Sequence, residues 1–103
     1  MRSKEVLMKM ASFLVPPRII TRSNSTMEVE EGEDVNLRCG ATGDPVPLIE
    51  WKRQSKLLQS SNSTANLRIT KIELKHGGNY ICTAKNAGGS TSYSVLVRVT
   101  RCK

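Results

Sequence analysis

The sequence predicts an all-β domain built as a β-sandwich of two packed antiparallel sheets. From Ile19 onward the apolar residues recur with a period of two, and turn-forming residues interrupt them at short spacing. The chain of 103 residues and 11.4 kDa is long enough for one domain with short tails. Roughly seven short strands in about 85 residues bury their apolar faces only by packing as two sheets.

The expected strands are stretches in which apolar and polar residues alternate. The clearest ones cover residues 35–39, 49–52, 67–69, 80–85 and 93–99. Turn signals separate them at Glu31-Gly32, Gly43-Asp44-Pro45, Ser60 to Thr64, Gly77-Gly78 and Gly88-Gly89. No stretch shows the 3.6-residue period of an amphipathic helix.

The expected organisation is a leader or linker over residues 1–16, a domain over 17–100 and a tail over 101–103. A basic start before the apolar stretch Val6 to Val15 resembles a secretory signal. Lys9 interrupts that stretch and no small-x-small cleavage site follows, so a linker is the favoured interpretation. No run of about 18 apolar residues exists, which predicts no membrane insertion in this fragment.

Four residues form a spaced pattern around the expected core. Trp51 follows Cys39 by 12 residues, and Cys82 follows Trp51 by 31. Two inward cysteines on different strands can bridge two sheets about 10 Å apart, with the indole against the bridge. Tyr80 stands two residues before Cys82, where its hydroxyl can bond back to the preceding corner.

With these residues the sequence resembles the intermediate (I-set) branch of the immunoglobulin superfamily. The resemblance covers roughly residues 17–100. The matching segments are Glu31-Gly32, Leu37-Arg38-Cys39, residues 43–47 leading into Ile49-Glu50-Trp51, Leu67-Arg68-Ile69 with Ile72, residues 78–82 and Asn86-Ala87-Gly88-Gly89. It implies a Greek-key sandwich with a structural disulfide between Cys39 and Cys82, packed on Trp51 and Tyr80.

Two departures from the family pattern change what is expected. His76 stands four residues before Tyr80, where the family usually has an acid paired with an arginine, so that ion pair should be absent. His76 is expected to be a solvated turn residue. Only 15 residues separate Trp51 from Leu67, too few for the extra strands of a variable domain.

The composition argues against catalysis and cofactors. The sequence lacks G-x-S-x-G, H-E-x-x-H and a phosphate-binding glycine loop, so no catalytic residue, enzyme activity or cofactor is predicted. One histidine and three widely spaced cysteines predict no metal site. Four aromatic residues are too few for a base-stacking surface, so no nucleic-acid partner is expected.

The leading functional hypothesis is a non-catalytic extracellular recognition or adhesion module, as in cell-adhesion and receptor proteins that carry similar domains. Its protein partner would be a cell-surface receptor, a ligand or a second copy. Strand parity puts two aliphatic residues among bases on one outward face, which is typical of a protein-binding patch. The predicted partner face consists of Lys52, Ile81, Lys85, Leu96 and Arg98.

Charge supports an alternative hypothesis. The net charge is +7, but residues 27–50 carry −6 and residues 51–103 carry +9. Clustered bases suit a polyanion. The alternative is a heparan-sulfate-binding domain, as in neuregulin-like growth factors or growth-factor receptors, with Lys52, Arg53, Lys56, Lys71 and Lys75 as the binding residues.

A third hypothesis is an intracellular, muscle-type I-set scaffolding domain, which needs no disulfide. The cysteine pair favours a secreted protein or the extracellular part of a cell-surface protein. Asn24 and Asn62 begin N-glycosylation acceptor triplets, which adds slightly to that location. Cys102 has no evident partner and is expected to be a free thiol or to pair outside this chain.

Overall fold

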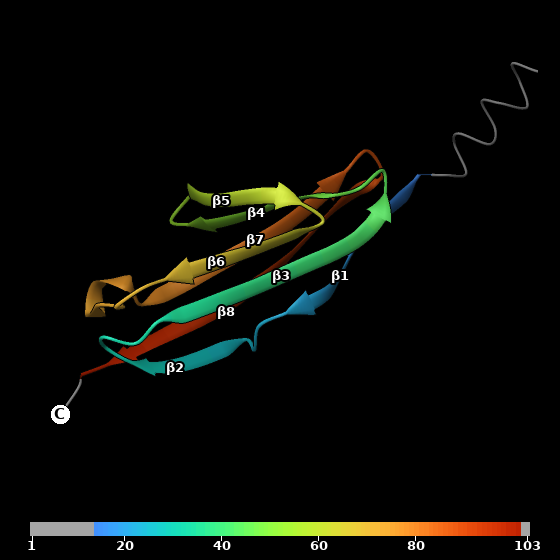
Figure 1. Cartoon of the computed structure of the whole chain (residues 1–103). Coiled ribbons are helices and arrows are strands. Elements are labelled where there is room, and N and C mark those ends of the chain that lie inside the picture. The colour runs from blue at the N-terminus through green and yellow to red at the C-terminus, as the bar shows by residue number, and fades with distance from the viewer. Residues whose placement is uncertain (1–13, 102–103) are drawn as a thin grey trace, which may run out of the picture.

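A computed structural model describes residues 14–101, and these form a sandwich of two β-sheets (Figure 1). The predicted leader or linker up to residue 13 and the pairing of Cys102 lie outside the described residues. The first strand begins at Val15. The elements are β1 (Val15–Arg22), β2 (Thr26–Glu30), β3 (Val35–Asp44), β4 (Leu48–Arg53), β5 (Lys56–Asn62), β6 (Thr64–Ile69), the short 3₁₀ helix η1 (Leu74–His76), β7 (Gly78–Asn86) and β8 (Gly89–Thr100).

The strands divide into a three-stranded sheet, β1-β3-β6, and a five-stranded sheet, β2-β8-β7-β4-β5. The prediction of two antiparallel sheets needs one correction, because β2 pairs with β8 in parallel. The chain leaves the first sheet after β1 and joins the second at Thr26 without reversing its direction. β2 therefore continues in the direction of β1, and this direction is parallel to that of β8.

The predicted turn from Ser60 to Thr64 is wrong, since nearly all of it is strand. β5 follows β4 through a two-residue loop, in which Gln54 and Ser55 have φ values of 52° and 65°. Two positive φ values match the right-handed twist of a hairpin. The interval between Trp51 and Leu67 holds one strand of the larger sheet, β5, which forms its edge.

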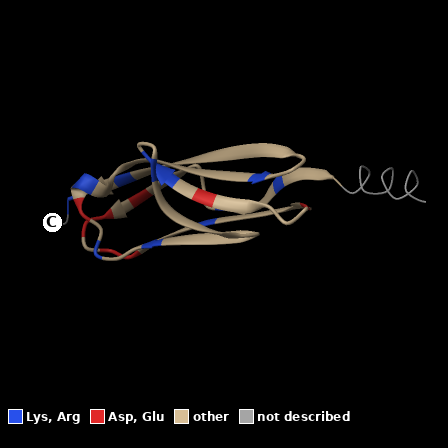
Figure 2. Ribbon diagram, turned by 90° about the horizontal axis from the view of Figure 1, so that it is seen from above, with Lys and Arg blue, Asp and Glu red and all other residues tan. Residues whose placement is uncertain are grey.

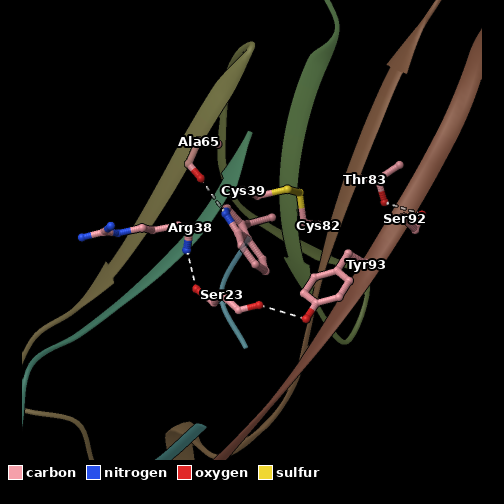
Figure 3. The surroundings of a disulfide bond; sticks show 9 residues. Ser23, Arg38, Cys39, Ala65, Cys82, Thr83, Ser92 and Tyr93 are labelled. Carbon is pink, nitrogen blue, oxygen red and sulfur yellow. Dashed lines mark hydrogen bonds between the residues drawn. A yellow bond between two sulfur atoms is a disulfide. The ribbon is translucent and has the colours of Figure 1, made fainter. Parts of the chain in front are cut away.

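The core lies between the sheets and contains the predicted residues. Cys39 of β3 and Cys82 of β7 form a disulfide with Cα atoms 6.5 Å apart, which confirms the predicted bridge between the sheets (Figure 3). Trp51 is fully buried, and its Nε1–H donates to the Ala65 carbonyl at 2.9 Å. Without this hydrogen bond the buried indole N–H would have no partner. The bond therefore offsets the cost of removing the N–H group from water.

Ser23 ties the two sheets together at the point where the chain changes sheet. Its Oγ accepts the Arg38 backbone N–H at 2.8 Å, and its carbonyl accepts the Tyr93 hydroxyl at 2.9 Å (Figure 3). The Arg22 guanidinium lies over the Tyr93 ring, 4.7 Å from its centroid. The break between β1 and β2 is therefore held from both sides.

Candidate functional site

The outer face of the five-stranded sheet carries the predicted partner residues. Trp51, Tyr80 and Cys82 point inward, so the residues that alternate with them on β4 and β7 point outward. Lys52 lies opposite Ile81, and Ile81 lies opposite Ser94 of β8. The structure thus brings Lys52, Ile81, Lys85, Leu96 and Arg98 onto one face, as strand parity predicts.

Leu96 is less exposed than its outward strand parity predicts. Ile81 is 42% exposed, whereas Leu96 is half-buried. The cause is β2, which lies beside β8: Leu96 pairs with Thr26, and its N–H donates to the Ser25 carbonyl at 2.8 Å. Ile81 and Leu96 are also diagonal neighbours, since Leu96 lies opposite Asn79.

Two further aliphatic residues on this face were not predicted. Leu57 of β5 lies opposite Lys52 and is 49% exposed, and Leu48 of β4 lies opposite Lys85. A strand over residues 56–62 would have placed Leu57, but the serines and asparagine there favour a turn. The exposed aliphatic side chains of the outer face are therefore Leu48, Leu57 and Ile81.

Acidic residues partly neutralise the predicted basic surroundings. The Glu50 carboxylate lies 3.9 Å from Lys52 Nζ and 4.0 Å from Lys85 Nζ, and its side chain is only 17% exposed. Arg98 lies 3.7 Å from Glu28 on the neighbouring β2. The outer face thus combines aliphatic side chains with ion pairs of both signs, rather than a ring of bases.

The five predicted polyanion-binding residues do not form a single patch of free cations. The Arg53 guanidinium donates to the carbonyls of Lys75 and Gly77, each at 2.7 Å. Lys75 lies 3.9 Å from Glu73, and the Lys71 backbone N–H donates to Asp34. Figure 2 shows blue and red residues gathered together at the end of the sandwich where β8 finishes.

His76 lies at this end and is not the solvated turn residue expected. It is half-buried in η1, and its Nδ1 accepts the Glu73 backbone N–H at 2.8 Å. The Tyr80 hydroxyl donates to the His76 carbonyl, which confirms the predicted bond to the preceding corner. Burial raises the pKa of Tyr80, although the Arg53 charge beside it acts in the opposite direction.

The opposite end of the sandwich is held by Asn86, the last residue of β7. Its Nδ2 donates to the carbonyls of Val15 and Pro45, and its Oδ1 accepts the Gly88 N–H, all at 2.8 Å. One side chain therefore joins the start of β1, the β3–β4 loop and the β7–β8 turn. A Cβ on Gly88 would lie 3.1 Å from the Pro16 nitrogen, so the turn packs closely on β1.

The remaining predicted residues and motifs have the following places. Asn24 lies in the break between β1 and β2, and Asn62 ends β5; both are exposed. Within residues 14–101 no group of His, Cys, Asp and Glu is arranged to hold a metal ion. None of the helical structure described is long and apolar enough to cross a membrane.

Known proteins with similar sequences and structures share this fold. A family model for the immunoglobulin domain matches residues 16–86. Hemicentin-1 of Mus musculus is 34% identical over 95 residues, which cover 85% of this chain and 2% of the length of hemicentin-1. The solved immunoglobulin domains 1–5 of sidekick-1 are 30% identical, with a TM-score of 0.75 over 86% of this chain and 20% of theirs.

A second solved structure is that of the complex between titin M10 and an immunoglobulin domain of obscurin-like 1. It is 25% identical to this chain, with a TM-score of 0.75, and the match covers 86% of this chain and 98% of the other.

Proposed function

Because the chain belongs to the immunoglobulin-domain family, we propose that it is a non-catalytic recognition domain that binds a protein partner through the outer face of its five-stranded sheet. The observation that carries the proposal is the exposure of Leu48, Leu57 and Ile81 on one continuous face. Between 37% and 49% of the surface of each of these residues is exposed, and a partner would remove this area from water.

The chemistry of this face suits a protein rather than a small ligand. Ile81 lies on β7, the middle strand of the sheet, between Lys52 and Ser94. Fully burying one such aliphatic side chain contributes roughly 1.5–3 kcal/mol. The ion pairs of Glu50 with Lys52 and Lys85 supply polar contacts of both signs around it, as interface rims do.

We propose a secreted or cell-surface location for this domain. The Cys39–Cys82 disulfide supports it, because such bonds persist in oxidising compartments. The exposed sequons at Asn24 and Asn62 are in keeping with it. The likeness to the titin M10 complex keeps an intracellular scaffolding role as the competing proposal. A thiol count on protein from native tissue separates them, because free thiols at both Cys39 and Cys82 would favour the intracellular role.

The test of the partner face is the double variant Ile81→Ser with Leu57→Ser. Both residues are about half exposed, so the free energy of unfolding should change by no more than about 0.5 kcal/mol. Self-association in sedimentation, or binding of the soluble domain to cells in flow cytometry, should weaken at least tenfold.

The matched control is Ile20→Ser, since Ile20 is exposed but belongs to β1 in the other sheet. Equal weakening by Ile20→Ser would show that the effect does not belong to this face. Unchanged binding by the double variant would place the recognition surface elsewhere.

Heparan sulfate remains a second proposal, favoured by one contact. The bond from the Arg53 guanidinium to the Lys75 carbonyl links η1 to the end of β4, where Arg53 pairs with Lys56. Changing Lys56 and Lys75 to Glu should lower the salt concentration at which the domain leaves a heparin column. Each contact between a base and a sulfate group releases counterions, so the loss of these contacts weakens binding. Lys71→Glu is the control, since Lys71 lies beside the Asp34 carboxylate. An equal shift from Lys71→Glu would contradict a site at this turn.

A further inference from the structure

The sandwich is open on the side where β5 of one sheet and β6 of the other come close in the chain. Only Ser63 separates these strands, and the chain crosses between the sheets there (Figure 1). β6 pairs with β3 on one side and is the edge of the three-stranded sheet on the other. Within residues 14–101, no strand therefore lies against the outer edge of β6.

The register of β3 and β6 shows which backbone groups face that open edge. The Ala41 N–H donates to the Ser63 carbonyl at 2.8 Å beside the Gly40–Thr64 pair. In an antiparallel ladder this makes Ala65, Leu67 and Ile69 the residues bonded to β3. The backbone groups of Asn66 and Arg68 then point to the open edge, and no loop or turn bond described for residues 14–101 engages them.

A groove of about 390 Å³ runs beside this edge. Leu67 and Ile69 of β6 and Leu58 of β5 provide its apolar lining, and Tyr80 contributes from the core side. Leu58 is 37% exposed, so the groove has room for further apolar side chains. An extended peptide along β6 would place alternate side chains into it.

The charges around the groove favour an acidic occupant. Arg53, Arg68 and His76 line it, and no carboxylate does. The Arg53 guanidinium donates to two neutral carbonyl groups, and none of the ion pairs described within residues 14–101 involves it. Arg68 contacts Asp34 at 3.1 Å. A second copy of this chain is disfavoured as occupant, because each copy carries a net charge of +7.

We propose that β6 accepts an extended segment of a partner protein, with alternating apolar and acidic residues, as an added fourth strand of the three-stranded sheet. The peptide's backbone pairs with Asn66 and Arg68, and its apolar side chains enter the groove against Leu58. Its acidic side chains alternate with these and point to the opposite face of the sheet, where they meet Arg68. This surface is distinct from the outer face of the five-stranded sheet.

The test uses a fluorescently labelled nine-residue peptide of alternating valine and glutamate with blocked ends, titrated with the full chain and followed by polarisation. Leu58→Ser should weaken its binding at least fivefold. The matched control Leu57→Ser changes the adjacent residue, which lies opposite Lys52 and does not line the groove, and should stay within twofold of the wild type. Melting curves check that both variants are folded.

Two altered peptides test the added strand and the charge. N-methylation of either all valine or all glutamate amides blocks one edge of the peptide, so one of these peptides should lose binding and the other should keep it. Any other pattern overturns the strand addition. Replacing glutamate by lysine should abolish binding, and equal binding would overturn the charge argument.

The outcomes separate this proposal from the proposed partner face. Absence of binding to the valine–glutamate peptide at millimolar concentration, or equal weakening by Leu57→Ser and Leu58→Ser, overturns the groove site. Ile81→Ser, on the other surface, should leave peptide binding unchanged.

Discussion

Neighbouring residues of β7 have opposite surroundings. Cys82 is fully buried in the disulfide, whereas Ile81, one residue earlier, is 42% exposed on the outer face. The same alternation runs along β4, where Trp51 is buried and Lys52 is not. Substitutions of the inner residues should therefore affect the stability of the domain more than substitutions of the outer ones. Substitutions on the two faces of one strand should separate folding from binding.

The largest expected effect is loss of the disulfide. Replacing both Cys39 and Cys82 by Ala opens a loop of 44 residues, the separation of 43 plus one, and should lower the free energy of unfolding by roughly 4 kcal/mol. Urea denaturation measures this change. Peptide mapping without reduction should find the two cysteines linked in the wild type, and a link from either of them to Cys102 would contradict the pairing.

Asn86 and Lys85 offer a matched comparison at the end of β7. Asn86→Ala removes three hydrogen bonds and should cost about 2 kcal/mol, since each neutral bond contributes about 0.5–1.5 kcal/mol. Lys85→Ala loses one exposed ion pair and should change stability by less than about 0.5 kcal/mol. Thermal melts of both variants test this difference. Similar losses would mean that the Asn86 contacts are not the main anchor of β1.

Substitutions of His76 test the contacts of η1, the short helix that precedes β7. His76→Asp should be tolerated or should stabilise by up to about 1 kcal/mol, because a carboxylate can accept the Glu73 N–H and meet Arg53. His76→Ala keeps neither contact and should cost about 1 kcal/mol. Melting temperatures compare the two. Clear destabilisation by His76→Asp would show that the imidazole ring itself is required.

The smallest expected effect belongs to Asp34 and depends on pH. The Lys71 backbone N–H, with Arg68 beside it, lowers the pKa of this carboxyl below its ordinary value. Because the folded pKa lies below the unfolded one, the ionised form stabilises the fold above the unfolded pKa. This contribution disappears as the pH falls through the folded pKa. Denaturation at several acidic pH values should show a shallower loss for Asp34→Asn, and identical curves would contradict it.

Much of the fold and part of the candidate site were predictable from sequence. Period-two patterns fix which side of a strand faces the core, so the inward positions of Cys39, Trp51 and Cys82 were correct. The same parity put Lys52, Ile81 and Arg98 on the outer face. The sequence did not reveal β5, because its hairpin loop, Gln54-Ser55, lacks the glycine or asparagine that usually signals positive φ.

The sequence pattern therefore predicts local features, namely the alternation along each strand and the inward positions of Cys39, Trp51 and Cys82, while the pairing of the two cysteines came from the family resemblance. Other features depend on neighbours far away in the chain and follow only from the fold. Leu96 is half-buried because β2 lies beside β8, and Glu50 of β4 meets Lys85 of β7. The edge of β6 is open because the chain crosses to it directly at Ser63. Parity gives the side of a sheet on which a residue lies, but only strand order determines what lies next to it.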